Sequence, residues 1–259
     1  MNFFEAVLLG VIQGLTEFIP VSSSGHLVIT QYFLNIKQDQ MLFNIILHMG
    51  TLVPIFIIFG DDIKDIISFK PSKRKETCYI LLAIIPTGII GVLFEDFFAN
   101  LFANAYLTAL MLLVTGFILY FTEKIATGNK KVNELKFWQP ILIGLAQSFA
   151  IIPGISRSGT TIAASLTQKL SRKEAARFSF LISVPVIGGA GFLQLLDLLK
   201  VGSFDLPFKI IFTGFLTAAV SGYFAIKILL KILAEKKLNY FAYYCWLVAV
   251  IVILINYLN

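Results

Sequence analysis

The stretch Gly10–His26, GVIQGLTEFIPVSSSGH, decides the fold, because its pattern returns at Gly144–Thr160 as GLAQSFAIIPGISRSGT. Aligned without gaps, the two stretches share a first glycine, a glutamine, two serines separated by one residue, and a glycine after the second serine. Both lie in strongly apolar sequence. Two copies in a chain of 259 residues indicate duplicated halves. In membrane proteins, broken apolar segments at matching places in two halves point to a binding site where the repeats meet.

The composition excludes a soluble domain. Hydrophobic residues make up 58% of the chain and charged residues only 14%, whereas soluble domains carry about 25% charged residues. The formal net charge of +6 does not indicate nucleic-acid binding, because the basic residues lie in short loops between apolar runs. Cys78 and Cys245 are too few and too scattered for a disulfide framework or a metal site. The first residues lack the basic region of a cleavable signal peptide, so we expect the first segment to be retained.

Apolar segment lengths predict the fold class. A membrane-spanning helix needs about 20 apolar residues, and six segments qualify: about 41–60, 78–95, 105–122, 178–199, 210–230 and 240–257. Two further apolar regions, 3–34 and 138–168, are each interrupted by one copy of the repeated pattern. We expect each to form a re-entrant helical hairpin with a non-helical tip. The predicted fold is an all-α integral membrane protein with six transmembrane helices and two re-entrant hairpins.

The basic residues orient this arrangement. Most of the 21 Lys and Arg residues fall in four stretches, at 61–77, 123–137, 169–177 and 227–237. The positive-inside rule places these stretches in the cytoplasm and both chain ends outside. Each half then holds one hairpin and three spans, and an odd number of spans inverts the second half. We therefore predict an inverted-topology repeat within one membrane domain, 1–259, with repeats at about 1–125 and 136–259 and with the two hairpin tips meeting near the bilayer centre.

The first tip carries acid–base chemistry. Gln13 and Glu17 are four residues apart and share one helix face, and we expect Gln13 to contribute to substrate binding. A carboxylate inside a bilayer is costly and usually functional, although Glu17 could also brace the hairpin. His26 follows the tip and is a candidate general base or nucleophile. We interpret His48 as a hydrogen-bonded packing residue.

Small hydroxyl residues and one arginine suit an anionic phosphate. Backbone N–H groups and hydroxyls at a helix start favour an anion, although serines also cap helices. Arg157 offers a planar guanidinium for bidentate phosphate contact. A divalent cation, Mg²⁺ or Ca²⁺, would bridge Glu17 and the phosphate. The sequence contains neither a zinc-type His/Cys cluster nor a Walker-type loop. The candidate phosphate-binding hydroxyls are Ser22, Ser23, Ser24, Ser156 and Ser158.

At these residues the chain resembles the undecaprenyl-diphosphatase family, also called bacitracin-resistance proteins. The resemblance is carried by Gln13-Gly-Leu-Thr-Glu17 with its continuation to His26, and by Pro153-Gly-Ile-Ser-Arg-Ser-Gly-Thr-Thr161. The stretch Ser171–Pro185 is also similar to the family. The similarity covers essentially the whole chain.

The resemblance implies a metal-dependent phosphatase that hydrolyses undecaprenyl diphosphate to undecaprenyl phosphate and inorganic phosphate. This reaction recycles the lipid carrier for cell-wall synthesis and confers bacitracin resistance. The site would open to the outer face of the bacterial cytoplasmic (inner) membrane. Gln13 stands in the variable first place of its motif and removes one possible metal ligand. The roles implied by position are catalysis for Glu17, Ser23, His26 and Arg157, and diphosphate binding for Ser156, Arg157, Ser158 and Thr161.

Several alternatives stay open at this point. The nucleophile is Ser23, His26 or water. Inverted repeats with broken helices also characterise secondary transporters and lipid flippases, and the residues alone support that class equally well. A purely structural scaffold explains neither Arg157 nor Glu17. The implied partners are a polyprenyl diphosphate lipid and the bilayer, without nucleic acid. The oligomeric state is undetermined, and a homodimer is one candidate.

Overall fold

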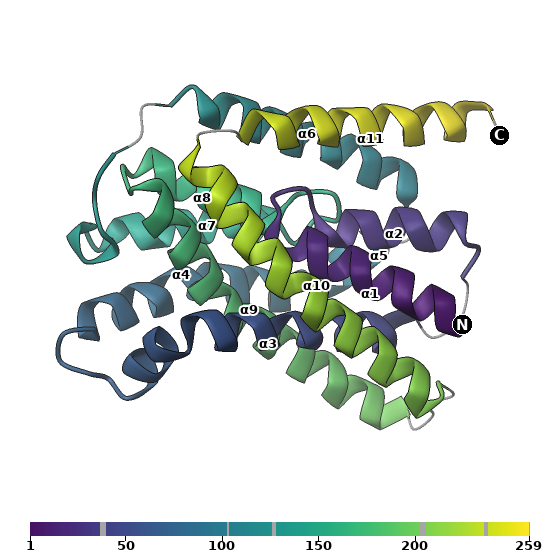
Figure 1. The fold of residues 1–259 in the computed structure, drawn as a ribbon, viewed down its shortest axis with the longest axis horizontal. Helices are drawn as coiled ribbons and strands as arrows, with labels where there is room; N and C mark the ends of the chain where they lie inside the picture. Colours follow the sequence, from purple (N-terminus) through teal and green to yellow (C-terminus); the bar gives the residue numbers. More distant parts are fainter. Residues whose placement is uncertain (37–39, 103, 126–127, 202–205, 236–237, 259) are drawn as a thin grey trace.

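The computed structural model is all-helical (Figure 1), and it describes residues 1–259 apart from 37–39, 103, 126–127, 202–205, 236–237 and 259. No β-strand occurs in the described residues. The helices, in chain order, are α1 (Phe3–Phe18), α2 (Ser23–Phe33), α3 (Gln40–Ile67), α4 (Arg74–Leu93), α5 (Glu95–Leu101), α6 (Ala105–Glu123), the short 3-10 helix η1 (Val132–Glu134), α7 (Trp138–Phe149), α8 (Arg157–Thr167), α9 (Arg172–Val201), α10 (Phe208–Ala234) and α11 (Leu238–Leu258).

Six described helices are long and apolar enough to cross a membrane, which confirms the predicted number of spans. They are Leu42–Ile67, Arg74–Leu93, Ala105–Glu123, Arg172–Leu196, Phe208–Leu233 and Leu238–Leu258. The fourth begins at Arg172 rather than at 178, because a hydropathy pattern marks only the apolar part of a helix. The sequence did not predict the short helices α5 and η1. Both are too short to cross a bilayer, so a search for spans does not find them.

Both repeated stretches break a helix where predicted. α1 ends at Phe18 and α2 begins at Ser23, while α7 ends at Phe149 and α8 begins at Arg157. Each new helix starts with a serine N-cap: the Ser22 hydroxyl accepts from the Gly25 N–H at 3.2 Å, and the Ser156 hydroxyl accepts from the Gly159 N–H at 3.0 Å. These caps satisfy backbone donors that the breaks would otherwise leave unpaired. The re-entrant placement of the two helix pairs in a bilayer stays a prediction.

The helices pack in matched pairs. α1 packs on α10 and α7 packs on α4, while α3 pairs with α9 and α6 with α11. Figure 1 shows α6 and α11 side by side along one edge. Equivalent carbonyls also face equivalent hydroxyls: Ser221 Oγ lies 3.3 Å from the Gly10 carbonyl oxygen, and Thr87 Oγ1 lies 3.2 Å from the Gly144 carbonyl oxygen. Duplicated halves would produce such pairing; the inverted topology stays a prediction.

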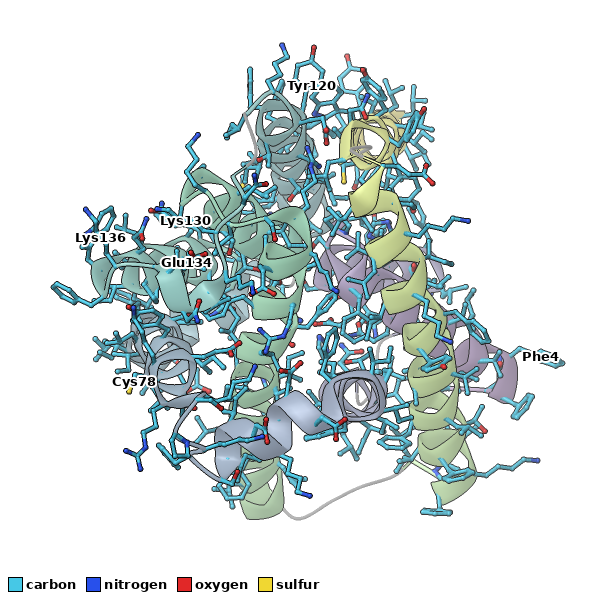
Figure 2. All side chains as sticks on the ribbon, turned by 60° about the vertical axis from the view of Figure 1, so that its left-hand side comes forward. Phe4, Cys78, Tyr120, Lys130, Glu134 and Lys136 are labelled. Carbon is cyan, nitrogen blue, oxygen red and sulfur yellow. The ribbon has the colours of Figure 1, made fainter. Side chains whose placement is uncertain are left out.

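The basic loops and the chain ends lie at opposite ends of the molecule. In Figure 1 the loops after α3 and after α6 lie at the left, and both termini lie at the right. Figure 2 shows Lys130, Lys136 and Cys78 on one side and Phe4 on the other. The exposed surface between these ends is rich in large apolar side chains, such as Phe224 and Leu247. This distribution of charge and apolar surface is the one that the positive-inside rule uses to orient a membrane protein.

An ion network joins three helices at the basic end. Arg177 of α9 donates to both Asp62 of α3 and Glu76 of α4. Lys73, just before α4, donates to Asp62 and to Glu76, each at 3.0 Å. Burial lowers the pKa of Lys73, but these two hydrogen bonds outweigh burial and hold the pKa above its usual value. The network ties the ends of α3, α4 and α9 together.

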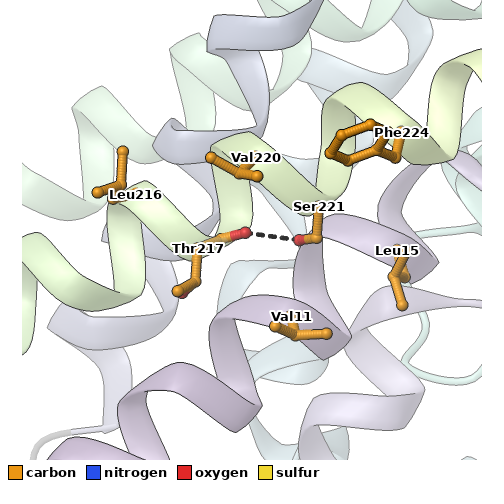
Figure 3. Close-up of a pocket in the computed structure, with 7 residues that line it drawn as sticks. All are labelled: Val11, Leu15, Leu216, Thr217, Val220, Ser221 and Phe224. Atoms are coloured by element: carbon orange, nitrogen blue, oxygen red, sulfur yellow. Dashed lines mark hydrogen bonds between the residues drawn. The ribbon is translucent and has the colours of Figure 1, made fainter.

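An apolar groove lies between α1 and α10 (Figure 3). Its volume is about 400 Å³, and the only polar side chains in its lining belong to Thr217 and Ser221. The Ser221 hydroxyl donates to the Thr217 carbonyl at 2.6 Å. None of the predicted site residues lines this groove. The lining residues are Val11, Leu15, Leu216, Thr217, Val220, Ser221 and Phe224.

Gly14 allows α1 and α10 to approach closely, and its replacement tests this contact. A Cβ atom at Gly14 would collide with the Ser221 hydroxyl and the Ala218 carbonyl. Small residues permit such close helix packing in membranes, so Gly14→Ala should destabilise the protein by about 2 kcal/mol through overpacking. Gly88→Ala is the matched control, because nothing lies within 4 Å of a Cβ at this helical glycine. Thermal unfolding in detergent measures both variants; equal melting temperatures would contradict the packing role of Gly14.

Candidate active site

Glu17 lies at the centre of the candidate site, in the last turn of α1. Its side chain is buried, at 5% exposure, and both oxygens are engaged. Oε1 accepts from the Arg157 guanidinium at 2.6 Å, and Oε2 accepts from the Ser23 hydroxyl at 2.6 Å and from the Gln13 amide at 2.8 Å. The structure therefore brings the two repeated stretches together through one carboxylate.

Arg157 is the first residue of α8, and its side chain is 13% exposed. One guanidinium nitrogen donates to Glu17, and another donates to the Ser179 carbonyl on α9 at 3.3 Å. Removing two opposite charges from water costs several kcal/mol per ion, so neither charge would be stable here without the other. Through these two contacts, Arg157 of α8 ties α8 to α1 and to α9.

The two tips touch directly. The Ser158 hydroxyl donates to the Ile19 carbonyl at 3.4 Å, and a Cβ at Gly25 would lie 3.1 Å from the Gly154 Cα. Thr115 of α6 braces the second tip: its hydroxyl donates to the Gly154 carbonyl at 2.8 Å and accepts from the Ser156 N–H at 3.0 Å. Gly154 has a φ of +97°, a conformation that favours glycine. The starts of α2 and α8 thus lie at one place.

The predicted phosphate-binding hydroxyls fall into two groups. Ser22 and Ser156 are N-caps, as the alternative interpretation of the serines anticipated, and each lies near the hydroxyl two residues later: 3.4 Å for Ser22–Ser24 and 3.3 Å for Ser156–Ser158. Thr161 is fully buried and turned toward α9, where its hydroxyl lies 2.6 Å from the Ser179 hydroxyl. Its contacts fix α8 against α9 rather than lead to Glu17.

The two histidines of the chain occupy different places. His26 contacts the Ser22 carbonyl through Nδ1 at 2.8 Å and the Tyr244 hydroxyl through Nε2 at 2.9 Å. In the described part of the chain, no hydrogen bond or ion pair joins His26 to Glu17. His48, which we interpreted as a hydrogen-bonded packing residue, is hydrogen-bonded to Asn44 and also places its Nε2 3.7 Å from Glu17 Oε2. Ser23 links the two regions, since it binds Glu17 and lies three residues before His26 on α2.

The sequence pattern did not place His48 or Tyr244 beside the candidate site. His48 sits on α3, and its Nδ1 lies 2.8 Å from the Asn44 carbonyl. Because a carbonyl only accepts, Nδ1 carries a proton and Nε2 faces the carboxylate. An intramembrane histidine was the available signal, but an apolar span does not reveal which face turns inward. Tyr244 belongs to no repeated pattern, so no local signal marks it.

The oxygen atoms of Glu17 and Gln13 could supply some, but not all, of the ligands of a divalent cation. The amide oxygen of Gln13, Oε1, is buried without a hydrogen-bond partner. The amide nitrogen of the same side chain donates to the Glu17 carboxylate. Amide and carboxylate oxygens are ligands that Mg²⁺ and Ca²⁺ accept. Within the described residues, no group of three or more His, Cys, Asp or Glu side chains could hold a metal ion. Glu17 and Gln13 would therefore hold a cation only together with waters or substrate oxygens.

The fold and site define a polytopic membrane protein whose two broken helix pairs meet at a buried carboxylate–guanidinium pair. The family model for bacitracin resistance protein BacA matches residues 6–251, and the chain belongs to this family. A protein of Halothermothrix orenii is 54% identical over 98% of both chains. One of Alkaliphilus metalliredigens is 42% identical over 100% of both chains, and one of Carboxydothermus hydrogenoformans is 44% identical over 99% of this chain and 98% of its own. Each of the three is named undecaprenyl-diphosphatase.

Removing one member of the Glu17–Arg157 pair should lower the stability of the protein more than removing both members. Arg157→Gln leaves a buried carboxylate unpaired and should cost about 3 kcal/mol of stability, whereas Glu17→Gln/Arg157→Gln should recover a large part of this loss. Lys70→Gln is the control, because the Lys70–Asp65 pair is exposed and such pairs contribute little. Thermal unfolding in detergent compares the variants. A double variant as unstable as Arg157→Gln would show that the pair does not act as a unit.

Proposed function

We propose that this protein hydrolyses undecaprenyl diphosphate to undecaprenyl phosphate and inorganic phosphate. The observation that carries the proposal is the cluster of Arg157, Ser23 and Glu17 where the two tips meet. The name of the relatives, undecaprenyl-diphosphatase, supports the same reaction. Hydrolysis would recycle the lipid carrier for cell-wall synthesis. It would also remove the diphosphate lipid that bacitracin binds, in keeping with the family's description as bacitracin resistance proteins.

Positive groups converge on the place where a diphosphate would bind. The N-termini of α2 and α8 both start at the joined tips, and a helix N-terminus carries a partial positive charge that favours anions. Arg157 adds a full positive charge. An incoming phosphate would share this guanidinium with Glu17. Phosphoryl transfer depends mainly on positioning and on neutralising charge on the transferred group. Ser24 and Ser158, next to the capping serines, would add hydroxyl contacts to the diphosphate.

Glu17 and Ser23 form the candidate acid–base pair. The Ser23 hydroxyl already donates to Glu17 Oε2 at 2.6 Å, so the carboxylate is placed to take that proton. In one route Ser23 Oγ attacks the terminal phosphorus and the bond to the bridging oxygen breaks, which releases undecaprenyl phosphate; water then hydrolyses the phosphoserine. In the other route Glu17 or His26 takes a proton from a water that attacks directly. A phosphoenzyme trapped on Ser23 or His26 would identify the nucleophile.

A divalent cation, Mg²⁺ or Ca²⁺, completes the proposed site. Glu17 would be its principal protein ligand, with the unpartnered Gln13 Oε1 beside it. When bound, the cation would neutralise charge on the diphosphate oxygens. Arg157 meanwhile donates to the other carboxylate oxygen and so orients Glu17.

The transporter or flippase alternative gains no support from the comparisons, since the named relatives are phosphatases. The polyprenyl tail of the substrate would lie in the bilayer alongside the apolar outer surface. A homodimer is a further prediction that light scattering in detergent would test.

We further propose that the protein lies in the bacterial cytoplasmic membrane, with the basic loops in the cytoplasm and the site open to the outer face. Cys78 is exposed near the basic loop 61–77, whereas Cys245 is buried. A membrane-impermeant thiol reagent should label Cys78 only after the cells are permeabilised. Tyr257→Cys in a Cys78→Ala background is the control near the opposite end, and it should be labelled in intact cells. Labelling of Cys78 in intact cells would reverse the proposed orientation.

Phosphate release from undecaprenyl diphosphate by the purified protein tests the function. We expect release with Mg²⁺ or Ca²⁺ and its loss with excess chelator. Arg157→Lys should lower kcat about 100-fold or more, because a lysine keeps the charge but loses the planar fork. Arg172→Lys is the control, since Arg172 also pairs with a carboxylate, Glu123, but away from the tips, and its kcat should stay near that of the wild type. A folded wild-type protein that releases no phosphate with either metal would overturn the proposal.

A further inference from the structure

The imidazole of His26 is held at both of its nitrogens. Nδ1 lies 2.8 Å from the backbone carbonyl of Ser22, and Nε2 lies 2.9 Å from the hydroxyl of Tyr244. The two rings are nearly parallel, with an interplanar angle of 5° and a centroid separation of 5.6 Å. Tyr244 lies on α11 and comes from the opposite end of the chain, so the last helix completes the surroundings of the first tip.

The hydrogen bonds determine the tautomer of the neutral ring. A carbonyl oxygen can only accept, so Nδ1 must carry the proton that it donates to Ser22. Nε2 of a neutral imidazole then holds the lone pair, and the Tyr244 hydroxyl must donate to it. A phenol hydroxyl is both donor and acceptor. Tyr244 can therefore donate to the neutral ring and accept from Nε2–H once the ring is protonated.

The place of His26 makes this contact relevant to the reaction. Ser23, three residues earlier on α2, donates to Glu17, and residues three apart lie on the same side of a helix. His26 is thus a neighbour of the candidate nucleophile, yet its ring is oriented by Ser22 and Tyr244 rather than by the Glu17–Arg157 pair. An unrestrained ring at this position could turn Nε2 away from the tip.

We propose that Tyr244 is a positioning residue for phosphate release: its hydroxyl fixes the His26 ring with Nε2 as the acceptor, and it gives up this nitrogen to water or substrate when His26 reacts. This inference rests on the proposed phosphatase activity. It assigns a role to α11, which carries none of the repeated motif, and it explains why a hydroxylated ring lies against the histidine. A phenylalanine would keep the parallel rings and lose only the hydrogen bond.

Tyr244→Phe and Tyr243→Phe form a matched pair for the kinetic test. Tyr243, the preceding residue, packs on Tyr120 and Trp246. Tyr244→Phe should lower kcat about tenfold, a fraction of what a general base contributes, while KM changes less than twofold. Tyr243→Phe should match the wild type. The effect of Tyr244→Phe should also vanish in a His26→Gln background, because residues that act through one group are not additive.

A spectroscopic measurement tests the positioning without catalysis. The chain has two histidines, so protein with ¹⁵N-labelled histidine gives ring-nitrogen signals, Nδ1 and Nε2, from only two imidazoles, and His48→Asn assigns them. The Nε2 signal of His26 should shift in Tyr244→Phe and stay in place in Tyr243→Phe.

The outcomes separate this inference from the proposed function. A shifted Nε2 signal with a tenfold lower kcat supports the role of Tyr244. Wild-type kcat in Tyr244→Phe, an unmoved Nε2 signal, or an equal loss in the His26→Gln background would each overturn it while leaving phosphatase activity intact. Absence of phosphate release in the folded wild type would instead refute the function on which the inference rests.

Discussion

The ion pair between Glu17 and Arg157 is the interaction on which the rest of the structure depends. Two buried charges are tolerable only when they meet with good geometry and when their remaining donors and acceptors are bonded. Ser23 and Gln13 complete the carboxylate, and the Ser179 carbonyl receives the guanidinium. This requirement joins α1 to α8 across the two halves of the chain. A single pair thus couples the arrangement of the helices to the chemistry of the site.

The broken helices follow from the same constraint. In a continuous helix, the carbonyls at the ends of α1 and α7 would accept hydrogen bonds from the next turn. A break leaves these groups without helical partners and lets a new helix begin at each tip. Those free groups need partners in an apolar environment. Serine caps, Thr115 and the direct contact between the tips supply them. Close packing through Gly14 then brings α10 against the first helix pair, so small residues at the helix contacts support the polar site at the centre.

The two histidines have different partners near the first tip. His48 reaches Glu17 from α3, and His26 is held by Ser22 and by Tyr244 of α11. Ser23 stands between them through its bond to Glu17. The candidate reactive groups therefore lie at a tip that is braced by several packed helices, and such bracing favours a preorganised site. Such preorganisation is what phosphoryl transfer needs, because the protein contributes positioning and charge more than covalent chemistry.

The sequence by itself determined the class of fold, the six spans and the two helix breaks, and it marked Glu17, Ser23 and Arg157 as candidate site residues. These are local properties: hydropathy, proline and glycine content, and a pattern repeated in the chain. Only the tertiary structure decided that Glu17 pairs with Arg157, that Thr161 turns toward α9, and that His48 and Tyr244 join the site. The physical reason is that an apolar helix is hydrophobic on all sides, so its sequence does not reveal which face packs inward. Contacts between residues as distant as His26 and Tyr244 arise only from helix packing.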